Sequence, residues 1–123
     1  MFPTTQRNPD RIPPDSANPR PVCVQVHYRI TGDLREYQSH AAAAAQQLAR
    51  LQGLSWKLWL LDPLSGDAAG IYLFSDAAAA AAFLVGPALS GLRQHPAIAD
   101  VSARSLGVLT DLSLTTFGAR AGL

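Results

Sequence analysis

The sequence has little of several features that mark particular classes of protein. Cys23 is the only cysteine, so no intrachain disulfide can form, and the lack of a charged and apolar leader agrees with a cytoplasmic location. The 10 basic and 9 acidic residues nearly cancel, and the basic ones are scattered, which argues against a nucleic-acid partner. The alanine-rich run 77–85 is too short to span a membrane and ends at Gly86 and Pro87, so a soluble protein without a membrane partner is expected.

Motifs for metal, nucleotide and hydrolase chemistry are also missing. His27, His40 and His95 lie far apart in the chain, and no two have the spacing of zinc ligands, so no metal site is predicted. The sequence has no glycine-rich phosphate loop, no G-x-S-x-G turn and no cysteine with a base close by in sequence. A small neutral ligand is therefore the expected partner besides the protein itself.

The first 21 residues differ in composition from the rest. They hold six of the nine prolines, separated by polar residues and almost without aliphatic side chains, so we expect an extended arm rather than part of a core. Residues 22–123 are enough for one domain with a buried core. The predicted organisation is an arm over 1–21 and a single α+β domain over 22–123.

Apolar periodicity predicts the order strand, helix, strand, strand, helix, strand. Strands are expected over 22–30, 54–61, 70–74 and 98–109, and helices from Asp33 to Gly53, over 77–85 and over 87–93. Gly107 is a candidate bulge, and residues 112–117 are expected to form an extended tail. This order is that of the ferredoxin-like split βαβ fold, an antiparallel sheet with its helices on one face.

The aromatic residues gather in the hairpin of 54–61 and 70–74, which a turn at 62–67 connects. Two alanine-rich helices cannot cover both faces of a sheet whose central hairpin is apolar front and back, so the bare face is expected to pack on a second copy, giving a homodimer. Strict alternation assigns the side chains of the first hairpin strand to two faces: Leu54, Trp56, Leu58 and Leu60 on one, Trp59 and Leu61 on the other.

Three stretches resemble the YdhR family, whose members carry a mono-oxygenase label: Gly53-Leu54-Ser55-Trp56-Lys57-Leu58-Trp59, Gly70-Ile71-Tyr72-Leu73-Phe74-Ser75-Asp76 and Gln25-Val26-His27. The likeness covers residues 22–116 in element order and leaves out the arm. It implies the dimeric α+β barrel fold, in which two ferredoxin-like sheets meet face to face. It also implies oxidation of polycyclic phenols without a metal, flavin or other cofactor. Haem degradation occurs in the same broad fold, and His95 is the candidate axial ligand for that alternative.

Cofactor-free oxygenation needs a base, an apolar pocket and hydrogen-bond donors. His27 is the candidate base because histidine titrates near neutral pH, and it shares the polar face of its strand with Gln25, a candidate substrate-binding residue. Tyr72 is the second catalytic candidate, as a hydroxyl donor. The alternative role of His27 is a hydrogen bond within the dimer interface.

Trp56, Trp59 and Phe74 are the candidates for binding an aromatic substrate, with core packing as their alternative role. Because the two tryptophans lie on opposite faces, only one is expected to line a given cavity. Lys57 is either a solvated lysine at a strand edge or a group that orients an oxyanion or pairs with a carboxylate.

The predicted function is oxygenation of an aromatic, polyphenolic or quinol-like small molecule. The alternative is a non-catalytic homodimer that binds a hydrophobic ligand. The two are distinguished by whether His27 and Tyr72 converge on one cavity.

Overall fold

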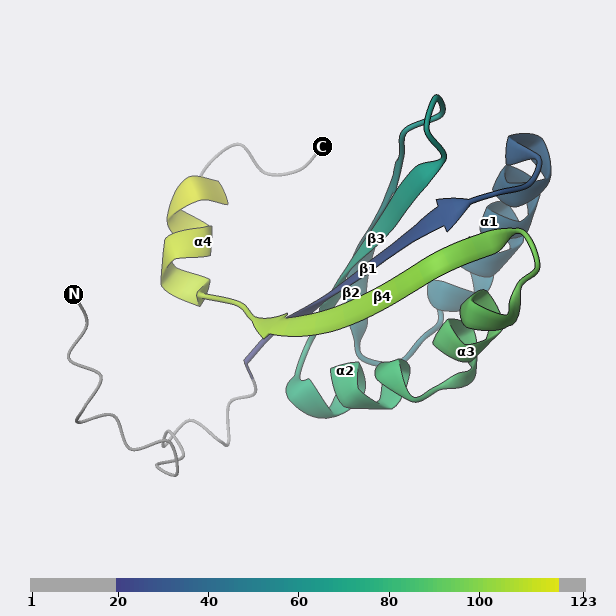
Figure 1. Cartoon of the computed structure of the whole chain (residues 1–123). Helices are drawn as coiled ribbons and strands as arrows, with labels where there is room; N and C mark the ends of the chain where they lie inside the picture. The colour runs from purple at the N-terminus through teal and green to yellow at the C-terminus, as the bar shows by residue number, and fades with distance from the viewer. Residues whose placement is uncertain (1–19, 118–123) are drawn as a thin grey trace.

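A computed structural model describes residues 20–117 of the chain. The elements are β1 (Val22–Ile30), α1 (Leu34–Leu48), β2 (Leu54–Leu61), β3 (Asp67–Phe74), α2 (Ala77–Leu84), α3 (Pro87–Gln94), β4 (Ile98–Gly107) and α4 (Thr110–Phe117). The strands form one antiparallel sheet in the order β2-β3-β1-β4 (Figure 1). The predicted ferredoxin-like α+β fold is confirmed. The arm predicted over 1–21 lies, apart from residues 20 and 21, outside the described residues.

The core lies between the sheet and the layer formed by α1, α2 and α3 (Figure 1). Alternation along the central strand β1 determines which of its side chains point into the core. Val24 and Val26 are fully buried there, and Tyr28 and Ile30 are nearly so. Phe83 and Leu89 pack onto them from α2 and α3, and α1 contributes partly buried residues. The helices therefore cover one face of the sheet and leave the other open.

Local signals in the sequence define the helix starts. The carboxylates of Asp33 and Asp76 accept hydrogen bonds of 2.8 Å from the amides of Arg35 and Ala79, and Pro87 occupies the first turn of α3. The end of α1 at Leu48 is earlier than the predicted end at Gly53, because the chain uses the intervening residues to turn into β2. Gly53 lies in that turn with a φ of 89°, a conformation that favours glycine.

The β2–β3 hairpin is longer than predicted and contains a bulge. β3 begins at Asp67 rather than Gly70, because Gly66, with a φ of 83°, reverses the chain and donates its amide to the carbonyl of Asp62 at 2.8 Å. The register shifts between Leu54 and Trp56, which places Leu54 opposite Phe74 and against the core. The prediction that Leu54 shares a face with Trp56 is therefore wrong, because a bulge interrupts the alternation.

The C-terminal part of the described chain departs most from the prediction. β4 ends at Gly107, and the register between β1 and β4 shifts near Asp100, which has a φ of 58°, so the bulge is there rather than at Gly107. The expected extended tail is wrong as well, since residues 110–117 form helix α4. Its early Asp111 suits the positive end of a helix, and the hydroxyl of Thr115 bonds back to the carbonyl of Asp111 at 3.0 Å.

The open face of the sheet is apolar over β2 and β3. Trp56 on β2, Leu60 on β2 and Leu106 on β4 are each 45–47% exposed there. In Figure 1 the helix layer lies on one side of the sheet, and α4 stands apart beyond the end of β4. No helix within residues 20–117 is long and apolar enough to cross a membrane.

Candidate functional site

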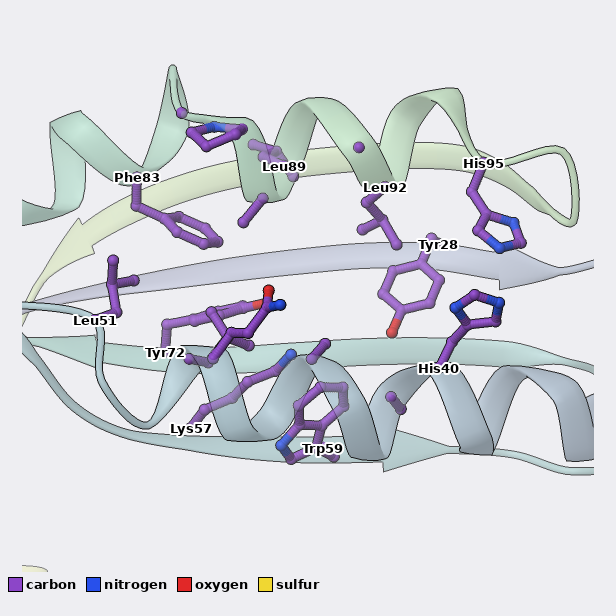
Figure 2. Close-up of a pocket in the computed structure, with 18 of the residues that line it drawn as sticks. Tyr28, His40, Leu51, Lys57, Trp59, Tyr72, Phe83, Leu89, Leu92 and His95 are labelled. Atoms are coloured by element: carbon purple, nitrogen blue, oxygen red, sulfur yellow. The ribbon is translucent and has the colours of Figure 1, made fainter.

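A cavity of about 580 Å³ lies between the sheet and the helix layer (Figure 2). Its floor comes from β1, β2 and β3, and its walls come from α1, α2 and α3. Alanines on the facing sides of α1 and α2, among them Ala41, Ala44 and Ala82, take up little space and so leave the volume open. Cavities of about 300–1,000 Å³ hold small organic ligands.

All three tyrosines of the chain line this cavity: Tyr28, Tyr37 and Tyr72. The hydroxyls of Tyr28 and Tyr37 are hydrogen-bonded to each other. Burial raises the pKa of Tyr72 and, together with the bond to Tyr37, the pKa of Tyr28. Both phenols therefore stay protonated at neutral pH, where they act as hydrogen-bond donors rather than bases.

Lys57 on β2 extends into the same cavity. Its Nζ atom is 3.1 Å from the centre of the Trp59 ring and 4.5 Å from the centre of the Tyr72 ring. The faces of the two rings attract the ammonium group. The cost of removing this group from water is larger than that attraction, so burial lowers the pKa of Lys57 to about 7. The amine is consequently unprotonated in a large share of molecules at neutral pH.

Two histidines occupy another part of the cavity, beside Tyr28 (Figure 2). The rings of His40 on α1 and His95 after α3 meet edge to face with centroids 5.3 Å apart. Nδ1 of His95 accepts a hydrogen bond of 3.0 Å from the amide of Ala97, which orients the ring. In the described part of the chain, no three histidine, cysteine, aspartate or glutamate side chains come close enough together to share a metal ion.

Two of the six predicted site residues, Tyr72 and Trp59, line the cavity. Phe74 stacks on Tyr72 in the core, with ring centres 6.2 Å apart, and is fully buried with its ring centre 5.3 Å from that of Phe83. The Tyr72 ring packs on the same Phe83 at 4.5 Å. Phe74 therefore does not line the cavity itself but packs against Tyr72 and Phe83, which do.

The other three predicted residues lie on the open face of the sheet. Gln25 and His27 alternate with the buried residues of β1, and Trp56 pairs with Leu73 on the side away from the helices. Within residues 20–117, His27 and Tyr72 thus belong to opposite faces and do not converge on one cavity. Trp56 and Trp59 are separated in the same way, with Trp59 in the cavity.

Several cavity residues were not singled out from the sequence. Tyr28, Tyr37 and His40 read as strand or helix positions without a motif, and only the fold brings them together. For Lys57, the only lysine among 10 basic residues, the sequence allows two alternative roles: a solvated lysine at a strand edge, or a group that orients an oxyanion or pairs with a carboxylate. Alternation along β2 places Lys57 on the same face as Trp59 and Leu61, which is the face that the helix layer covers.

Comparison with known proteins agrees with this architecture. No curated protein matches the chain. Two crystal structures of SnoaB, a cofactor-independent oxygenase from Streptomyces nogalater, are similar to this structure. A mutant of SnoaB has a TM-score of 0.60 at 19% identity over 74% of this chain and 95% of that chain. A second SnoaB structure has the same TM-score and identity over 72% of this chain and 93% of that chain. Heme-degrading protein Rv3592 from Mycobacterium tuberculosis, heme-free, has a TM-score of 0.51 at 19% identity over 76% of this chain and 97% of that chain.

These structural likenesses concern the fold. The family is shown by sequence: a family model described as "Putative mono-oxygenase ydhR" matches residues 23–119, from the second residue of β1 to beyond the end of α4. The chain therefore belongs to the YdhR family.

Proposed function

We propose that the protein is a cofactor-independent mono-oxygenase that oxidises an aromatic, polyphenolic or quinol-like small molecule in the cavity between the sheet and the helix layer. The observation that carries this proposal is the make-up of the cavity in a chain of this family: every tyrosine, one tryptophan and the only lysine meet around an apolar space. Flat aromatic rings bind well to such walls.

The chemistry needs nothing beyond substrate and oxygen when the substrate is itself electron-rich. At an activated ring CH₂ group, one oxygen atom of O₂ replaces the two hydrogens as a carbonyl and the other leaves as water, so the substrate supplies all the electrons. The chain's part is to bind the ring, remove a proton and stabilise the resulting oxyanion. Trp59 and Tyr72 are the proposed substrate contacts, with the Tyr72 hydroxyl as donor and Phe74 as support.

We also propose that the protein acts as a homodimer whose open sheet faces pack together. The apolar side chains of β2 and β3 on that face support this arrangement, since exposed patches of this kind are uncommon on monomers. Gln25, His27 and Trp56 would then lie in the interface, which favours the hydrogen-bonding role of His27 over its role as the base.

The test is oxygen uptake with an anthrone-type phenol, with oxygen-18 gas to show that one atom enters the product. Trp59→Ala should reduce uptake at least about tenfold because it removes one wall of the cavity. Trp56→Ala is the matched control if it remains dimeric, since it removes the tryptophan of the opposite face and should retain uptake. His27→Ala should retain uptake if it remains dimeric, and a loss in the dimer would restore His27 as the base. Binding without any uptake would instead support the non-catalytic, ligand-binding alternative.

A further inference from the structure

The backbone of the sheet makes room for one particular amine. Gly70 on β3 lies opposite Trp59, and a Cβ at this position would lie 2.9 Å from Cε of Lys57 and 2.9 Å from Cε1 of Tyr72. Because Gly70 has no side chain, the aliphatic part of Lys57 can lie over the neighbouring strand β3. Its Nζ atom thereby reaches the rings of Trp59 and Tyr72 (Figure 2).

The described residues around the cavity supply no counter-ion for this amine. None of the lining residues within 20–117 is an aspartate, a glutamate or an arginine. The other titratable groups there are phenols and imidazoles, from Tyr28, Tyr37, Tyr72, His40 and His95. A buried ammonium group without an anion is costly, and a ligand is what can provide the anion.

We propose that Lys57 is the base of the cavity: its amine accepts the proton of an acidic hydroxyl on an aromatic ligand, and the ammonium group so formed holds the aryl oxide. This inference rests on the proposed function for its ligand, an aromatic molecule in this cavity. The step is balanced within the site, because the O–H bond breaks as the N–H bond forms and a neutral pair becomes an ion pair. The ring faces of Trp59 and Tyr72 stabilise the new cation.

The nature of the site favours a phenol over a carboxylic acid. A carboxylate is already ionised and strongly hydrated at neutral pH, so its transfer into an apolar cavity is expensive. A phenol enters uncharged and ionises only after it has left water, with its negative charge spread over the ring. An arginine could not perform this exchange, because its guanidinium group does not lose its proton in proteins.

The test follows ionisation of a bound probe without oxygen, so that it does not depend on turnover. 6-Cyano-2-naphthol is bound under argon at about pH 7.5, between the lowered pKa of Lys57 and the higher one of the free naphthol. Its neutral and anionic forms have different absorption bands. Three proteins are compared: wild type, Lys57→Met and Lys57→Arg. Titration calorimetry in buffers of different ionisation enthalpy counts the protons released on binding.

In the wild type the anion band should appear on binding with almost no proton released, because Lys57 keeps the proton. Lys57→Arg should show the same band with about one proton released per ligand, since arginine is already charged. Lys57→Met should bind the neutral form of the naphthol. The acid dissociation constant of the bound naphthol should be at least about tenfold smaller in this variant than in wild type. A neutral band in the wild type, or an anion band that persists in Lys57→Met, would overturn the role of Lys57.

6-Cyano-2-methoxynaphthalene, which has no acidic proton, separates this inference from the proposed function. The wild-type protein should bind it, because its binding needs no proton acceptor. If it binds and the naphthol stays neutral in the wild type, the role of Lys57 fails alone. If neither compound binds any of the proteins, the aromatic cavity ligand fails, and the proposed function and this inference fall together.

Discussion

At the scale of single residues, the lowered pKa of Lys57 has a consequence for stability that does not depend on any ligand. The folded-state pKa is about 7, whereas the ordinary value is 10.5. Between these two pH values the unfolded chain binds more protons than the folded one, so stability rises with pH across this window. Below it both states carry the proton, and the folded state holds the costly, partly buried charge.

Lys57→Met should therefore raise the melting temperature, by about 5 °C at pH 6, because it removes a buried charge and keeps a flexible side chain of similar length. The gain over wild type should shrink as the pH approaches 10. Thermal unfolding followed by circular dichroism at several pH values measures both effects. Lys57→Arg serves as the control, since it stays charged and should lack the rise in stability at high pH. Parallel curves for wild type and Lys57→Met would contradict the lowered pKa.

Pattern alone could place some of these side chains and not others. The opposite orientations of Trp56 and Trp59 follow from alternation, and the structure confirms them. The burial of Lys57 could not be predicted, because it depends on what packs over the strand, in this case α1 and its small residues, and on the space left by Gly70 on a neighbouring strand. Neither is a property of the strand that carries Lys57.

At the scale of elements, the sequence predicts best where a local signal starts or stops the chain. Asp76 before an alanine run and Pro87 after Gly86 place α2 and α3 correctly. Bulges are harder to predict. The departures from alternation at Leu54 and Asp100 depend on how each strand pairs with its neighbour, which the sequence of one strand does not determine. Helix α4 was harder still, since it has few contacts with the sheet domain that an apolar pattern would reveal.

The cap of α2 gives a test at this scale. Phe83 on the alanine-rich helix α2 packs in the core. At the start of α2, the Asp76 carboxylate accepts a hydrogen bond from the amide of Ala79. Asp76→Ala should lower the free energy of unfolding by about 1 kcal/mol, measured by urea denaturation. Asp76→Asn, which keeps a side-chain oxygen as acceptor, is the matched control and should lose much less. Equal losses in both variants would show that the cap bond does not stabilise the helix.

At the scale of the whole molecule, the two faces of the sheet have different chemistry. One face builds the core and the cavity with α1, α2 and α3. The other presents apolar side chains from β2 and β3 together with Gln25 and His27 from the central strand. That the helices cover one face follows from the element order, which the sequence predicts. The proposed dimer, in which a second copy covers the other face, follows from the apolar side chains that this face presents.

A substitution at Leu58 tests the role of that second face. Leu58 on β2 pairs with Ile71 on β3, and both belong to the open face. Light scattering at micromolar concentration should give twice the mass of one chain for wild type. Leu58→Arg should give a single-chain mass, since it would bury an unpaired guanidinium group in the proposed interface. Val85→Arg is the matched control: Val85 is 87% exposed at the end of α2, on the helix side, so this variant should stay dimeric. A wild-type protein of single-chain mass would rule out the sheet-to-sheet dimer, and a dimeric Leu58→Arg would move the interface elsewhere.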